Sequence, residues 1–168
     1  MRQDKSGLRC VPVGKQGLLT GAAPALVADV LRRYGQVRLR AHGCSMFPVI
    51  RSGDVLSIRY CTTEAVQPGD VVLVADGDRL FAHRLIKKRL RNDECLLVTR
   101  GDSHWRNDPP RPASTLLGQV TGVSRNGQAL RAPFCSTLAG RLFGLAASES
   151  RGLTRRIRHS LTVLARER

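Results

Sequence analysis

The sequence predicts a mainly β protein: an antiparallel sheet domain with a short helix before it and a basic helix after it. Two observations predict this class. Between residues 37 and 130 the chain consists of short β-type runs separated by turn residues. No helical pattern alternates with these runs, as the crossovers of a parallel sheet would require, so antiparallel pairing is expected. A chain of 168 residues is long enough for one such domain with an adequate core.

The first predicted element is an amphipathic helix over residues 24–34. Its apolar residues fall on one face, two arginines lie near its end, and Gly35 follows. A basic last turn and a glycine stop are typical of a helix C-terminus. The alternation of residues 37–40 then predicts the first strand. On this basis the chain divides into a lead-in with the helix (1–36), a β-rich domain (37–130) and a basic helical segment (131–168).

Five further strands are expected within the β-rich domain. Turn sequences such as Ser-Gly-Asp, Gln-Pro-Gly-Asp, Arg-Asn-Asp and Arg-Asn-Gly separate them. The Asp-Gly-Asp at 76–78 predicts a tight hairpin between two of them. The five strands are residues 55–60, 70–76, 79–90, 95–100 and 116–124.

The net charge indicates which classes of binding partner to expect, and the cysteines indicate the cellular compartment. The chain carries 28 Lys and Arg against 13 Asp and Glu, a net charge of +15 that favours nucleic acid, acidic peptides or anionic lipid as partners. Its five cysteines are dispersed and form no cluster with histidines. This predicts neither a disulfide framework nor a metal site, and no cofactor is expected. A reducing cytoplasm is the simplest location.

No segment of the sequence predicts a membrane span or a signal peptide. Nowhere do 18 apolar residues follow one another, and the N-terminus lacks an apolar core region. Residues 131–168 hold eight Arg against two Glu, and four apolar residues in 151–168 recur at helical spacing. Such a helix can bind an anionic membrane surface, nucleic acid or an acidic partner. The alternative is a surface helix docked on the β domain, or a frayed tail.

Ser45 is the candidate nucleophile. It lies in the sequence Gly-Cys-Ser-Met-Phe-Pro at 43–48, just before the predicted strand 55–60. A serine hydroxyl attacks a carbonyl only when a base removes its proton and N–H donors stabilise the oxyanion. Gly43 can bring main-chain N–H groups close to the attacked carbonyl, and Met46 can anchor the turn in the core. By itself this motif is short, and most serines in turns are not catalytic.

His83 is the candidate base. It lies in Leu-Phe-Ala-His-Arg-Leu-Ile at 80–86, where apolar neighbours favour the neutral imidazole that accepts a proton. The alternative is a structural histidine in the core. Two other histidines are rivals: His42 is too near Ser45 in the chain to orient easily, and His104 lies in a polar loop without an evident partner.

Asp102 and Asp108 are candidates for the carboxylate that a histidine base uses. They lie in Thr-Arg-Gly-Asp-Ser-His-Trp-Arg-Asn-Asp at 99–108. A carboxylate on the second ring nitrogen selects the correct tautomer and stabilises the imidazolium. Each aspartate also has a structural alternative, a turn after Gly101 for the first and a cap before Pro109 for the second.

Together these segments resemble the signal peptidase I superfamily of serine peptidases (the S24/S26 type), and most of all its endoplasmic-reticulum and sporulation branch. The resemblance lies in GCSMFPVIRSGD, GDVVLVADGDRLFAHRLI, VTRGDSHWRNDPP and LLGQVTGV, four boxes in order over residues 41–124. It implies an antiparallel peptidase fold shared with the SOS-repressor peptidases. It also implies Ser45 as nucleophile, His83 as base in place of a lysine, Asp108 as third member and Asp102 as a supporting aspartate.

The implied activity is cleavage of a leader or pro-segment from a precursor protein or peptide by acyl-enzyme chemistry. Two departures stand out: no membrane anchor is visible, and Gly43 stands where many members have a Ser or Thr that contributes to the oxyanion hole. The hole would then rest on main-chain N–H groups, chiefly that of Ser45. The alternative is an inactive or self-cleaving regulatory module that binds nucleic acid or an acidic partner. A single short helix at 24–34 makes nucleic acid the weaker choice.

Overall fold

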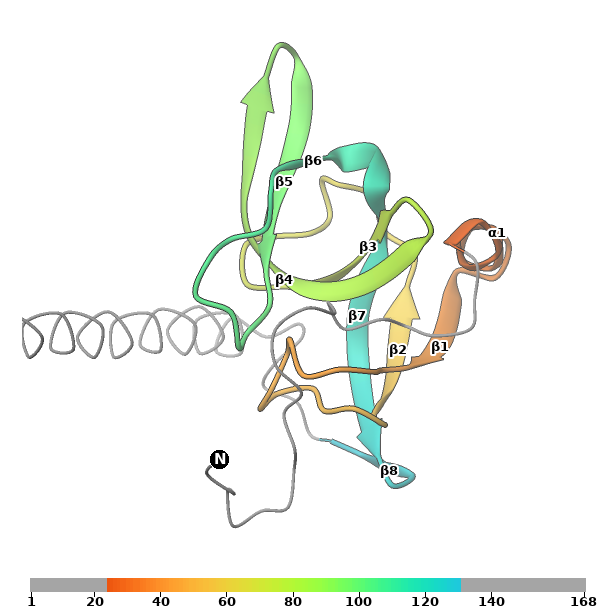
Figure 1. Cartoon of the computed structure of the whole chain (residues 1–168). Helices are drawn as coiled ribbons and strands as arrows, with labels where there is room; N and C mark the ends of the chain where they lie inside the picture. The colour runs from red at the N-terminus through yellow and green to blue at the C-terminus, as the bar shows by residue number, and fades with distance from the viewer. Residues whose placement is uncertain (1–23, 131–168) are drawn as a thin grey trace, which may run out of the picture.

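The computed structural model describes residues 24–130. The basic segment 131–168 and the residues before the helix lie outside this range, so the predicted C-terminal helix and its membrane contact stay predictions. One α-helix is followed by strands throughout, and the predicted mainly β class is confirmed (Figure 1). The elements are α1 (Pro24–Tyr34), β1 (Gln36–Arg40), β2 (Val55–Arg59), β3 (Val71–Asp76), β4 (Arg79–Arg91), β5 (Glu94–Arg100), β6 (Arg111–Pro112), the 3-10 turn η1 (Ala113–Thr115), β7 (Leu116–Arg125) and β8 (Gln128–Ala129).

The helix and the six longer strands agree with the predicted segments to within one residue at each end. The sequence analysis did not predict three short elements: β6, η1 and β8. Each has only two or three residues, too few for a periodicity to be seen.

The strands form one antiparallel sheet in the order β1-β2-β7-β3-β4-β5-β6, with β8 added to β7. Strand β4 takes part in both halves of the sheet. Its residues 79–84 pair with β3, and its residues from Arg84 onward pair with β5. The β4–β5 hairpin therefore extends well beyond the end of β3 (Figure 1). Along residues 79–83, the edge of β4 that faces away from β3 is not paired with any strand of residues 24–130.

The middle of the sheet separates two hydrophobic cores. Val71, Leu73, Leu80 and Ala82 face the larger core, which also contains Met46. Their neighbours in the two strands face a smaller core, made of Val66, Val72, Val74, Phe81, Leu85 and Leu97. Because side chains alternate along a strand, β4 is buried on both faces from Leu80 to Leu85. His83 points to the side of the smaller core.

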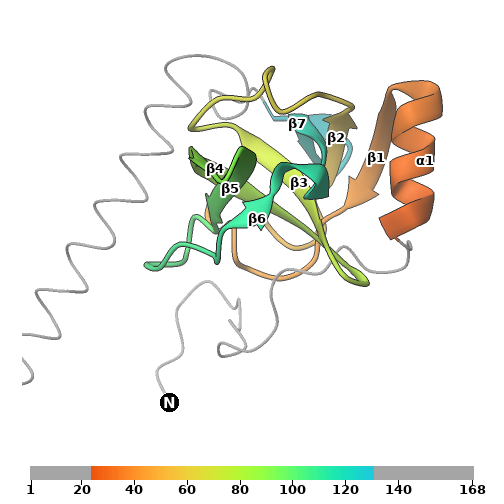
Figure 2. The same ribbon diagram turned by 90° about the horizontal axis from the view of Figure 1, so that it is seen from above.

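Helix α1 packs beside the sheet and contributes to the larger core. Val27 and Leu31 are buried there, and α1 lies alongside β1 when the molecule is seen from above (Figure 2). The N–H of Gly35, at φ +71°, donates to the oxygen of Leu31 and ends the helix. With 11 residues α1 is too short to cross a bilayer, and the described part of the chain contains no helix with the length and apolarity to do so.

Candidate active site

Ser45, His83 and Asp108 form one hydrogen-bonded row. The Oγ of Ser45 lies 3.1 Å from Nε2 of His83, and Nδ1 of His83 lies 2.6 Å from Oδ2 of Asp108. All three side chains are buried, with His83 fully so. The row joins the turn after β1, the middle of β4 and the loop after β5, which are separated by 38 and 25 residues along the chain.

The turn that carries Ser45 lies within residues 41–54, and hydrogen bonds join the two ends of this segment to each other. The N–H of Ala41 donates to the oxygen of Asp54, and the N–H of Gly53 donates back to Ala41. Met46 is buried in the larger core, and its main-chain oxygen accepts the N–H of Ile50. Gly43 has φ +88°, in the left-handed region that favours glycine. Gly43 and Met46 thus shape the turn, one before the nucleophile and one after it.

The loop after β5 fixes this turn from the other side. The oxygen of Ser45 accepts two hydrogen bonds from Ser103, one from its N–H (2.8 Å) and one from its hydroxyl (2.9 Å). The N–H of Asp102 donates to Sδ of Met46 at 3.4 Å. Ser103 was not among the predicted site residues, since a serine in a polar loop gives no sequence signal of its partner.

Thr99 holds Asp108 in position, and the sequence analysis did not identify it. The N–H of Asp108 donates to the oxygen of Thr99 at 2.8 Å, and the Thr99 hydroxyl donates to Oδ2 at 2.7 Å. Burial raises the pKa of Asp108, but the hydrogen bond and charge of His83, with the bond from Thr99, outweigh it and leave that pKa lowered. The carboxylate beside His83 is therefore ionised at neutral pH.

Asp102 does not contact His83; it pairs with Arg84, the residue after the histidine. Both oxygens of Asp102 accept from the guanidinium, Oδ1 from Nε and Oδ2 from Nη2, each at 2.7 Å. The third donor of Arg84, Nη1, reaches the oxygen of Gly69 at 2.6 Å. This buried ion pair links β4, which carries His83, to the loop after β5, which contacts the Ser45 turn. Its two-point geometry is that of a strong charge-assisted contact.

The two rival histidines occupy different places. His42 is exposed on the Ser45 turn. His104, for which the sequence showed no partner, packs against His83 in a T-shaped contact, at 5.7 Å between ring centroids and an interplanar angle of 89°. His104 therefore has a ring contact that the sequence does not reveal, because its loop folds back toward the base.

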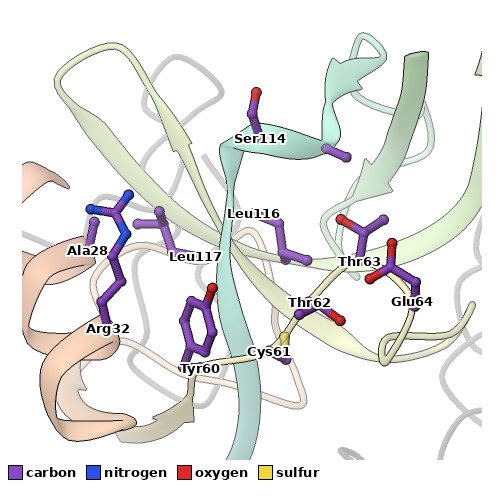
Figure 3. Close-up of a pocket in the computed structure, with 11 residues that line it drawn as sticks. Ala28, Arg32, Tyr60, Cys61, Thr62, Thr63, Glu64, Ser114, Leu116 and Leu117 are labelled. Carbon is purple, nitrogen blue, oxygen red and sulfur yellow. The ribbon is translucent and has the colours of Figure 1, made fainter. Parts of the chain in front are cut away.

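A small cavity of about 20 Å³ opens beside Ser45. It lies between the nucleophile turn, Leu56 and Ala82 of β4. A larger cavity of about 290 Å³ is lined by none of the three residues of the row. Figure 3 shows Arg32 of α1, Tyr60, Glu64 and Leu117 among the residues that line it. Of these two cavities, the small one borders Ser45.

Residues 24–130 contain no group of three or more His, Cys, Asp or Glu side chains placed to hold a metal ion. The row can nevertheless do acyl-transfer chemistry with its own groups. It contains a hydroxyl, an imidazole that accepts its proton and a carboxylate that stabilises the imidazolium.

Comparison with known proteins gives one family. The model described as Peptidase S24-like matches residues 24–120, more than half of the 168 residues, and the matched range contains Ser45, His83 and Asp108. No curated protein and no solved structure matches the chain.

Proposed function

The chain belongs to the Peptidase S24-like family, and we propose that it is a serine endopeptidase that removes a leader or pro-segment from a precursor protein. We place it in the signal-peptidase-like branch with a histidine base, as its sequence boxes suggest. The observation that carries the proposal is the hydrogen-bonded row of Ser45, His83 and Asp108. A buried row in this order has the composition that acyl transfer needs.

The ionised carboxylate of Asp108 selects the useful tautomer of His83. A carboxylate with a lowered pKa can only accept a hydrogen bond, so the proton of the neutral imidazole lies on Nδ1. Nε2 then has a free lone pair facing the Ser45 hydroxyl at 3.1 Å. This is the arrangement in which histidine can accept the serine proton.

The reaction proceeds in two halves. Ser45 Oγ bonds to the scissile carbonyl carbon while its proton passes to Nε2 of His83, and the same proton then goes to the leaving amine as the C–N bond breaks. Water next attacks the acyl-enzyme ester, gives a proton to His83 and releases the acid with Ser45 restored. The oxyanion would be held by main-chain N–H groups, chiefly that of Ser45 behind Gly43.

The unpaired edge of β4 offers a place for the substrate backbone. The N–H and oxygen of Leu85 bond to Asp70 and Gly69 on the β3 side. By alternation, the main-chain groups of Ala82 and Leu80 point to the opposite edge. An extended substrate can therefore add there as a strand, with its scissile carbonyl near Ser45.

The small cavity sets the preferred residue before the scissile bond. With about 20 Å³ between Ser45 and Ala82, it has room for one water-sized group. Alanine and glycine fit such a space, whereas leucine or phenylalanine would force the walls apart. We therefore expect cleavage after small residues.

The decisive experiment labels the purified chain with a fluorescent fluorophosphonate, which acylates activated serines. The wild type should be labelled, Ser45→Ala should not be, and His83→Ala should be labelled about 1,000-fold more slowly. Ser52→Ala, an exposed serine of the neighbouring turn, is the matched control and should behave as the wild type. Cleavage of a precursor by both Ser45→Ala and His83→Ala would show that this mechanism is wrong.

Kinetic measurements distinguish cleavage of a precursor from the alternative, in which the chain cleaves itself. A peptidase acting on a precursor turns over many molecules, and its rate rises with enzyme concentration. Self-cleavage instead consumes each chain once, with a first-order rate independent of concentration. Intact-mass analysis of the chain alone and with an alanine-containing peptide distinguishes the two.

A further inference from the structure

His104 lies beside the proposed base, yet the mechanism above does not use it. Its ring meets the His83 ring edge to face, and its side chain is only partly exposed. The N–H of His104 donates to the oxygen of Gly101 at 2.9 Å, which closes a turn that brings the imidazole back to the site. A second imidazole is thus held next to the reacting atoms.

Gly101 lies against both imidazoles, and its lack of a side chain lets them approach each other. A Cβ atom at residue 101 would lie 3.0 Å from Nδ1 of His104, 3.2 Å from Nε2 of His83 and 2.6 Å from the oxygen of Ser45. The two ring nitrogens are therefore at most about 6 Å apart. Within this limit, one water molecule can hydrogen-bond to both nitrogens at once.

The surroundings favour the neutral form of His104. Burial lowers its pKa, and so does the charge that His83 acquires, while Asp108 acts in the opposite direction with a smaller effect. A neutral imidazole has one nitrogen that accepts a hydrogen bond. When that nitrogen is Nδ1, it can accept from a water that also contacts Nε2 of His83.

We propose that Nδ1 of His104 positions the water that hydrolyses the acyl-enzyme. The inference rests on the proposed function. The water oxygen bonds to the acyl carbon, one of its protons passes to Nε2 of His83 and then to Ser45 Oγ, and the ester C–O bond breaks. The second hydrogen of the water donates to Nδ1 of His104, which neither gains nor loses a proton. During acylation the leaving amine occupies the place that this water takes later. His104 is therefore a positioning residue for deacylation only.

Stopped-flow kinetics with N-acetyl-L-alanine p-nitrophenyl ester separates the two halves of the reaction. The burst of p-nitrophenolate reports acylation, and the steady state reports deacylation. In His104→Phe the burst rate should stay within about twofold of the wild type, while the steady-state rate falls at least tenfold and the acyl-enzyme mass accumulates. His104→Asn keeps an acceptor oxygen and should recover part of the steady-state rate. Asn107→Ala, an exposed residue of the same loop, is the control and should match the wild type.

Three outcomes would overturn the proposal. Equal losses of burst and steady-state rates in His104→Phe would assign the residue to the architecture of the site. Unchanged rates would remove any role, and a His104→Asn variant no better than His104→Phe would exclude the hydrogen bond. A wild type that is never acylated on Ser45 would instead refute the proposed function itself, and this inference with it.

Discussion

Residue 101 cannot carry a side chain without disturbing Ser45: a Cβ atom there would lie 2.6 Å from the main-chain oxygen of the nucleophile. That oxygen also accepts the two hydrogen bonds from Ser103. The Gly101–Ser45 contact therefore sets how closely the loop after β5 can approach the nucleophile turn.

Gly101→Ala should displace Ser45 and reduce acylation. A misplacement of about 1 Å at a reacting group can cost about 100-fold in rate, and the overpacked loop should lose about 1–3 kcal/mol of stability. Gly118→Ala is the matched control, because its Cβ would lie 2.5 Å from the oxygen of Arg59, away from the site. Both variants should melt at lower temperature in thermal unfolding. Only Gly101→Ala should lose fluorophosphonate labelling per folded molecule, and equal labelling in both would contradict the role given to residue 101.

Asp108→Asn should slow the reaction while the fold is kept. The amide can donate to Nδ1 of His83, which favours the tautomer with its proton on Nε2, facing Ser45. Such a change costs about 10,000-fold in kcat in a serine peptidase with a triad. Peptide cleavage should show this loss with KM nearly unchanged. The exposed Asp78→Asn should cleave at the wild-type rate, and a similar loss there would point to a general effect of charge.

Arg84→Met should be strongly destabilising, because it leaves the buried Asp102 carboxylate without its partner. Removing one member of a buried pair costs about 3–5 kcal/mol. The double variant Arg84→Met with Asp102→Leu removes both charges and should regain much of this loss. Urea unfolding of the wild type, both single variants and the double variant measures the coupling. Additive effects would show that the two side chains do not interact in the folded protein.

Folding stability should fall in acid through two aspartates, Asp108 and Asp54. Burial raises the pKa of Asp54, but hydrogen bonds from Arg125 and from the N–H of Arg51 more than offset it, so that pKa is lowered, as for Asp108. A lowered folded-state pKa stabilises the protein above the unfolded value of about 3.9, and this stabilisation is lost as the pH falls through the folded value. In unfolding measured from pH 7 down to pH 2, Asp54→Asn should be less stable than the wild type at neutral pH. The difference should shrink below about pH 4, and a constant difference would contradict the assignment.

The order of the elements was predictable from the sequence because each longer strand has its own alternation and its own turn residues. The hairpin turns at 92–93 and 126–127 adopt positive φ at both central residues, which Asn, Asp and Gly tolerate best. The elements that were missed, β6, η1 and β8, exist only because neighbouring strands pair with them or hold them. No local pattern marks such short pieces.

The supporting residues of the candidate site could not be predicted in the same way. Thr99 lies opposite Leu85 in the β4–β5 ladder, and only this register brings its hydroxyl to Asp108. Arg84 and Asp102 are 18 residues apart, and no spacing rule joins them. His104 looked unpartnered because the fold-back of its loop has no sequence signature.

The sequence by itself determined the antiparallel class, the strand positions and the identity of Ser45, His83, Asp102 and Asp108 as the residues to examine. The local patterns left open which aspartate faces the histidine, and the family resemblance implied Asp108. The tertiary structure assigned Asp108 to His83 and Asp102 to Arg84. The physical reason is that neighbouring side chains on β4 point to opposite faces, so His83 and Arg84 meet different parts of one loop. Strand register and loop conformation decide that pairing, and a slip of one residue would exchange the two faces.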